Sequence, residues 1–289
     1  KINLNAYRLN LRTFYKEWPQ RLSVKLLSQG KLESRYAIFS LKTDLQTPGV
    51  LIQLSGNHDR QWNIKWKISA AQLSTLLASY SGALHGMGTI KGNTLKPVWS
   101  GKLTGKDVSL FGYRVGELSS RWQVDLSYHQ TSRLEFNAQN FATRRMRLSK
   151  FSIDATGKPH AHQINALFTL SESTIGTTRI NLVLNGQLMK KSWQGYLRRL
   201  TIQSRMLGRW RLNNPAQMRI STTQITSTPI CIRSTRGRAC LQGEWHRQQA
   251  WQMQLTASGI NITPVLTLFK LNLHVQTPVT INAKATGQG

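Results

Sequence analysis

Apolar and polar residues alternate with a period of two over most of the chain. Between residues 117 and 126, one set of alternate positions is mostly apolar and the other is entirely polar; the first set is Leu118, Ser120, Trp122, Val124 and Leu126. Successive side chains of a β-strand point to opposite faces, so the pattern predicts a strand with one buried face. The alternation recurs at residues 61–68 and 133–138, and later at 164–170, 180–188, 251–257 and 271–275.

The expected strands follow one another at intervals of roughly 12 to 20 residues, separated by turn residues such as those at 156–159. This spacing predicts an all-β fold built as a long, curled antiparallel sheet. The phase slips by one between Leu197 and Leu200, which predicts a β-bulge that bends the sheet. No stretch rich in Gly, Ser or Pro divides the chain, so we expect residues 1–289 to form a single elongated unit.

Two short helices are expected as exceptions to the strand pattern. Residues 69–77 begin with a possible Ser N-cap and carry apolar residues spaced by three and four, and residues 263–269 have Pro264 at the first helical position. Both segments are predicted to lie on the sheet as plugs or lids.

The two cysteines of the chain lie nine residues apart, at Cys231 and Cys240, with Ser-Thr-Arg-Gly between them. Antiparallel pairing of these positions would make a hairpin in which Gly237 takes the left-handed conformation after a type I turn. The cysteines would then face each other, where a disulfide is feasible. The alternative is two unlinked thiols that pack as small apolar side chains. A disulfide would place the chain outside a reducing cytosol.

The charge balance is strongly basic, with 39 Lys and Arg against 11 Asp and Glu, a net charge of +28. Such a surface attracts polyanions, either nucleic acid or an anionic membrane face. No apolar run reaches the length of about 18 residues that a transmembrane helix needs. Because residue 1 is Lys, we expect the chain to be a piece of a longer protein whose membrane anchor lies outside it.

Nothing in the sequence predicts catalysis, a cofactor or a bound metal. The eleven acids are scattered, and no pair of carboxylates stands out as an acid and a base. His160 and His162 would project from one face of a strand, but no third ligand lies nearby in sequence. His58 and Asp59 have no serine in a nucleophile-elbow context to complete a triad. We therefore expect a non-enzymatic protein.

The arginines largely interleave with apolar positions, which places charge on the face opposite the hydrophobic one. A nucleic-acid-binding sheet would instead mix aromatic side chains and arginines on one face, so no nucleic acid is expected as a partner. The apolar face is either the core of a sandwich or an open groove for acyl chains, and periodicity does not separate the two. The side chains expected to line such a groove are Trp62, Ile64, Trp66, Leu118, Trp122, Val124, Leu134, Phe136, Ile180, Leu182 and Leu184.

An ordered series of short motifs over residues 50–270 resembles the TamB family of Gram-negative bacteria. The most specific piece is Trp-Arg-Leu-Asn-Asn-Pro at 210–215, followed by an alternating strand, a Cys, a short basic turn and Cys-Leu-Gln-Gly-Glu-Trp at 240–245. The glycine-rich segment at 84–92, Pro-Val-Trp-Ser-Gly-Lys-Leu at 97–103 and Ser-Trp-Gln-Gly-Tyr-Leu at 192–197 also look like it.

The resemblance implies an open, curled β-sheet with an apolar interior, anchored in the inner membrane through a segment outside this chain and crossing the periplasm. It also implies phospholipid acyl chains and the outer-membrane Omp85-class protein TamA as partners, with roles in phospholipid transport between the membranes and in outer-membrane protein assembly. Two alternatives remain open: a scaffold whose sheet edges pair with client β-strands, and an extracytoplasmic protein that binds polyanions such as lipopolysaccharide or nucleic acid.

Overall fold

The computed structural model of the chain is built almost entirely of β-strands. It describes residues 2–6, 23–33, 36–47, 49–143, 146–172, 176–189, 192–205, 207–235, 237–247, 250–260 and 279–288. The chain divides into two compact units, residues 1–147 and 148–289, and each is an antiparallel sheet. The all-β prediction is confirmed, whereas a single elongated unit stays a prediction.

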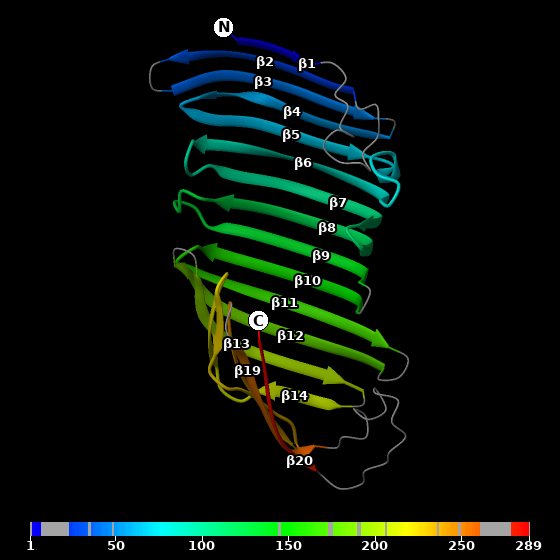
Figure 1. The fold of residues 1–289 in the computed structure, drawn as a ribbon, viewed down its shortest axis with the longest axis vertical. Coiled ribbons are helices and arrows are strands. Elements are labelled where there is room, and N and C mark those ends of the chain that lie inside the picture. Colours follow the sequence, from blue (N-terminus) through cyan, green and yellow to red (C-terminus); the bar gives the residue numbers. More distant parts are fainter. Residues whose placement is uncertain are drawn as a thin grey trace. The chain divides into compact units, whose positions relative to one another are not determined.

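The first unit is a meander in which each strand pairs with the next (Figure 1). Its strands are β1 (Ile2–Ala6), β2 (Ser23–Glu33), β3 (Tyr36–Thr47), β4 (Val50–Asp59), β5 (Gln61–Ala70), β6 (Ser81–Asn93), β7 (Val98–Leu110), β8 (Tyr113–Asp125) and β9 (Ser132–Ala142). Tight turns hold the register. Phe111 and Gly112 join β7 to β8 with φ of 52° and 81°, the left-handed backbone that a two-residue hairpin turn requires.

The helix predicted at residues 69–77 is wrong. Strand β5 continues through Ser69 to Ala70, and only Leu73–Thr75 form a single 3-10 turn, η2. The carbonyl oxygen of Gly49 accepts the N–H of Ala71 at 2.8 Å, so a distant acceptor replaces the expected cap. The prediction that this segment packs on the sheet as a plug agrees with the structure, because Leu73 is buried against Val50 and Ala70 on the apolar side of the sheet. The helix predicted at 263–269 and the strand at 271–275 lie outside the described residues.

Aspartate 125 ends β8 and organises the turn into β9. Its carboxylate accepts hydrogen bonds from the N–H and hydroxyl of Ser127 and from the N–H of Gln130. These bonds, first that from the Ser127 hydroxyl and then that from the Gln130 N–H, lower the pKa of Asp125 from 3.8 to about 2. Alternation predicted a solvated side chain at this position. The structure instead leaves it 1% exposed, because the strand ends there and the turn folds over the carboxylate.

The second unit begins as a meander and then bends. Its strands are β10 (Arg147–Lys158), β11 (Ala161–Glu172), β12 (Gly176–Met189), β13 (Ser192–Ser204), β14 (Gly208–Leu212), β15 (Ala216–Ser221), β16 (Gln224–Ser227), β17 (Ile230–Arg233), β18 (Arg238–His246), β19 (Ala250–Ile260) and β20 (Val279–Gln288). Strand β13 pairs with β14 along one half and with β15 along the other. The later strands β19 and β20 run steeply across the direction of β10 and β11 (Figure 1).

Two prolines mark the line along which this sheet bends. Pro215 separates β14 from β15, and Pro229 separates β16 from β17, so two successive rungs of the ladder are each broken into halves. Proline lacks the N–H that a central strand position needs. The ladder resumes at once, since Asn213 donates its N–H to the Cys231 carbonyl at 2.8 Å. The bulge predicted between Leu197 and Leu200 in β13 is confirmed, since the register between β12 and β13 shifts between Val183 and Leu184.

The cysteine hairpin is formed in the predicted register, but Gly237 does not take the left-handed conformation predicted for it. Cys231 on β17 lies directly opposite Cys240 on β18, and their sulfur atoms are 2.14 Å apart, which is disulfide distance. Ser234 donates its N–H to the carbonyl of Gly237 at 2.8 Å and so closes the turn. The disulfide lies on the polar face of the hairpin, since the neighbouring residues Ile230 and Ile232 occupy the other face.

Candidate functional site: an uncovered apolar face

The register of the first unit gathers the apolar positions of five strands on one face. A single cross-strand row runs through Trp66, Gly88, Gly101, Trp122 and Leu134. Residues opposite each other in adjacent strands share a face, and every second residue along each strand shares it too. The same face therefore holds the eight side chains that the sequence assigned to a groove in this unit: Trp62, Ile64, Trp66, Leu118, Trp122, Val124, Leu134 and Phe136.

Two tryptophans pack closely over glycines on this face, which leave them room. The rings of Trp66 and Trp122 stack with centroids 5.8 Å apart and an interplanar angle of 11°, and Trp99 meets Trp122 edge-on at 5.7 Å. A Cβ atom on Gly101 would lie 2.5 Å from Cζ2 of Trp66 and 2.7 Å from Cζ2 of Trp122. The indole nitrogens of Trp66 and Trp122 are buried with no hydrogen-bond partner, which shows how apolar their surroundings are.

Within the first unit, the described residues form no second layer over this face and so no conventional core. The largest fully buried side chain in the described part of the chain is that of Asp125, which is not apolar. On the apolar face of the first unit, Trp99 remains 47% exposed and Leu134 36% exposed. Two facing sheets in a sandwich bury such side chains in a core about 10 Å thick. The exposure favours an open groove over a sandwich.

The second unit has an apolar face of the same kind. Ile180, Leu182 and Leu184 share one face of β12 and are half-buried. A row that starts at Leu188 on β12 runs through Trp193, Ile220 and Ile225 to Trp245 on β18, and so crosses the broken rungs without leaving the apolar side. The predicted groove residues of this unit are therefore part of a larger apolar surface that continues into the later strands.

That surface is hollowed where β16 to β19 meet. A pocket of about 540 Å³ is lined mainly by apolar side chains, namely Ile225, Ile230, Leu241, Trp245, Trp251 and Met253. Its volume lies in the range of sites that hold small molecules, of about 300 to 1,000 Å³. Leu241 and Met253 remain 38% and 44% exposed, so the hollow is open to solvent. An aliphatic chain is the ligand that such a surface favours.

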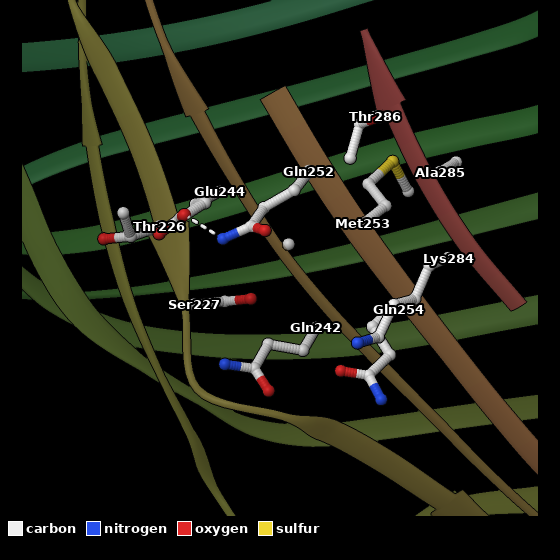
Figure 2. Close-up of a pocket in the computed structure, with 11 residues that line it drawn as sticks. Thr226, Ser227, Gln242, Glu244, Gln252, Met253, Gln254, Lys284, Ala285 and Thr286 are labelled. Atoms are coloured by element: carbon white, nitrogen blue, oxygen red, sulfur yellow. Dashed lines mark hydrogen bonds between the residues drawn. The ribbon is translucent and has the colours of Figure 1, made fainter. Parts of the chain in front are cut away.

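A smaller, polar pocket of about 170 Å³ lies beside the same strands (Figure 2). Gln242, Gln254 and Lys284 contribute to it, and Gln252 donates its side-chain N–H to the carboxylate of Glu244. One amide-bound carboxylate supplies neither an acid–base pair nor an activated nucleophile. This arrangement gives the pocket no visible catalytic chemistry.

His162 of the second unit is engaged in structural hydrogen bonds. The Nε2 atom of His162 accepts the indole N–H of Trp193 at 2.7 Å, so Nδ1 carries the proton of the neutral ring. His160 is exposed two residues away. Within the described ranges, no group of three His, Cys, Asp or Glu side chains is placed to hold a metal ion.

Several residues of the apolar face were not identified from the sequence. Trp99, Leu241, Trp245, Met253 and Leu255 share it by register, yet they were absent from the expected groove lining. Met253 and Leu255 fall in the stretch 251–257, whose alternation the sequence already showed. In β7 and β18, by contrast, Gly101 and Gly243 interrupt the apolar positions. The available signal was the spacing of Trp and Gly on alternate positions, as at Trp99 and Gly101.

Comparison with known proteins gives one match. The family model described as TamB, N-terminal domain, matches residues 42–288. No curated protein and no solved structure matches the chain. None of the helices among the described residues is long and apolar enough to cross a membrane.

Proposed function

The chain belongs to the TamB family, a family of cell-envelope proteins, and from this premise we propose that it is a section of a non-enzymatic conduit for phospholipid acyl chains. The apolar face is the path, and the lipid headgroup stays in solvent at its open side. In the full-length protein the conduit would serve phospholipid transport across the periplasm and outer-membrane protein assembly, together with TamA.

One observation carries the proposal: large apolar side chains stay exposed along one face of both sheets. Trp99 and Leu134 do so in the first unit, and Leu241, Met253 and Leu255 in the second. Exposed apolar patches of this extent mark ligand grooves or interaction sites on soluble proteins. An acyl chain that enters gains about 0.8 kcal/mol for each buried methylene group, so a few methylenes suffice for retention.

Energy of this kind is spread over many weak contacts rather than concentrated at one residue. A conduit needs that distribution, because a deep local minimum would trap the lipid. The stacked Trp66 and Trp122 rings, which lie close over Gly88 and Gly101, support this role because they form a broad apolar floor. The Cys231–Cys240 pair supports a periplasmic location, where disulfides persist.

Site-specific photocrosslinking tests the conduit with a matched pair of neighbouring residues. Leu255 lies on the apolar face and is 38% exposed, and Gln254, one residue earlier in β19, is exposed on the opposite face. A photoactivatable side chain at 255 should capture phospholipid in cells more strongly than one at 254, because only the face of Leu255 offers an apolar path. The pair shares strand, depth and exposure, so only the face differs.

Equal capture of phospholipid at positions 254 and 255 would show that lipid adsorbs to both faces of the sheet alike, and would refute the conduit. So would the absence of lipid at 255 and also at Trp122 in the first unit. If the client were instead an unfolded outer-membrane strand, the adduct at 255 would contain protein rather than lipid.

A further inference from the structure

The polar face of the second unit carries a dense group of arginines. Cross-strand pairing places Arg211 on β14 directly opposite Arg233 on β17, and Arg233 directly opposite Arg238 on β18. Side chains in such positions start from Cβ atoms about 5 Å apart. Arg209 lies on the same face, two positions from Arg211 in β14, and Arg199 lies two positions from Thr201, the partner of Arg211 in β13. Arg179 joins the same face through a row in which Gln203 pairs with both Arg179 and Arg209. We call these six residues the arginine patch.

The positive charge of the patch is not neutralised within the described part of the chain. All six side chains are exposed, and none has a carboxylate within ion-pair distance there. Glu244, the acid of β18, is held by Gln252 six residues from Arg238. Like charges directly opposite in a sheet destabilise it. The row of Arg211, Arg233 and Arg238 is thus unfavourable for the isolated protein and becomes favourable when an anion bridges the three guanidinium groups.

The row is also held in place. Cys231 and Cys240 lie on the same face of the same hairpin, two residues from Arg233 and Arg238, and Arg238 reaches the Sγ atom of Cys231 at 3.8 Å. A covalent link between β17 and β18 keeps the two arginines side by side despite their repulsion. A rigid pair loses little conformational freedom when it binds a ligand.

The choice of residue points to phosphate. The patch is built from arginines, whereas the polar face of the first unit mixes the lysines Lys65, Lys67 and Lys102 with Arg121 and Arg133. The guanidinium fork matches phosphate oxygens in a bidentate way that an ammonium group does not. The patch also spans five strands, which suits an array of phosphates rather than one small anion.

We propose that the arginine patch docks this section of the protein on the phosphate headgroups of an anionic phospholipid bilayer. The site lies on the face opposite the apolar groove and does not depend on the groove carrying lipid. Nucleic acid fits less well, because the row of three arginines has no aromatic neighbour on which bases could stack: Trp210 and Ile232 flank it on the other face.

Vesicle co-sedimentation of the full chain tests the proposal. The probes are vesicles of phosphatidylcholine alone, vesicles with about one third phosphatidylglycerol, and phosphatidylcholine vesicles given the same charge with oleate. The triple variant R211Q/R233Q/R238Q is compared with K65Q/K67Q/K102Q, which removes the same charge from exposed sites on the polar face of the first unit. Circular dichroism and thermal unfolding verify that both variants are folded.

The arginine variant should bind phosphatidylglycerol vesicles about a hundredfold more weakly than the unchanged chain, and the lysine variant should lose much less. Binding should be weaker to oleate vesicles and should fall steeply with salt. The uncharged substitution Leu255→Asn in the groove leaves the arginine patch intact, so it should weaken binding to phosphatidylglycerol vesicles far less than the arginine variant does. That variant separates failure of this proposal from failure of the conduit.

Three results would overturn the proposal. Equal losses in the two triple variants would show attraction by net charge alone. Equal binding to oleate and phosphatidylglycerol vesicles would remove phosphate recognition. If the arginine variant lost more affinity for duplex DNA than for vesicles, the patch would be a nucleic-acid site.

Discussion

Replacing Gly101 with alanine tests whether the tryptophan floor of the first unit depends on glycine. The added Cβ would lie 2.5 Å from Trp66 and 2.7 Å from Trp122, roughly 1 Å closer than an ordinary contact between carbon atoms. Both rings must lift or the strands must separate. Overpacking of this kind costs about 1–3 kcal/mol, which corresponds to a fall in Tm of about 2–4 °C per kcal/mol for a domain of 150–250 residues.

Urea unfolding of the purified chain measures this cost, and Gly243→Ala is the matched control. A Cβ on Gly243 meets only the flexible Met253 side chain, at 3.3 Å, and the Gln252 carbonyl, at 3.5 Å. It should change the free energy of unfolding by less than about 0.5 kcal/mol. In a Trp66→Leu background, Gly101→Ala should cost less than it does alone, because one of the clashing rings is gone.

The reasoning fails if Gly101→Ala and Gly243→Ala have the same stability. In that case the tryptophans can move off the face at no cost, and the tryptophan floor is not a property that the glycines maintain. A coupling free energy near zero between Gly101→Ala and Trp66→Leu would likewise show that Gly101 does not constrain the Trp66 ring.

Four further outcomes follow from the same contacts. Asp125→Asn should lower the free energy of unfolding at neutral pH. The difference in free energy of unfolding between this variant and the unchanged chain should shrink as pH falls from about 4 through about 2, because a carboxylate with a lowered folded pKa stabilises the fold only while it is ionised. Urea unfolding over this pH range measures the difference. Leu182→Asp should impair lipid transfer in a vesicle assay while Leu182→Ile should not. Arg233→Gln should stabilise the protein by about 0.2–1 kcal/mol in thermal unfolding, since it interrupts a row of like charges. Loss of the disulfide in Cys231→Ser/Cys240→Ser should cost about 2.5 kcal/mol, and a reductant should destabilise only the unchanged chain.

The strands and their faces could be predicted because alternation is a direct consequence of strand geometry. Each of the eleven expected groove residues lies on the apolar face of its own unit, since a period of two fixes the side of every residue once one is known. Their role in binding lipid stays a prediction. The cysteine register was accessible for a related reason: a short hairpin with a glycine at its turn admits few pairings.

The misses arise where a distant group decides the local structure. Ser69 has the character of an N-cap, but β5 continues through it because β4 and β6 offer ladder partners on both sides. Asp125 falls in the polar phase of its strand, yet the turn after it supplies three donors to its carboxylate. Here a local signal existed, since Asp followed two residues later by Ser is typical of a side-chain-capped turn.

The bulge in β13 shows why register, more than any single residue, maintains the division between the two faces. Leu197 and Leu200 are three positions apart, so a regular strand would point them to opposite faces. Val183 pairs with Arg199 and Leu184 with Leu197, which leaves Arg198 without a partner position and returns Leu200 to the side of Leu197. A one-residue slip anywhere else would turn apolar side chains outward and arginines inward. Deleting Arg198, the extra residue of the bulge, would leave Leu197, Arg199 and Leu200 paired with Leu184, Val183 and Leu182 as a regular strand. Both leucines would then stay on the apolar face, whereas deleting a residue from a regular stretch of β13 would turn the side chains beyond it to the opposite face.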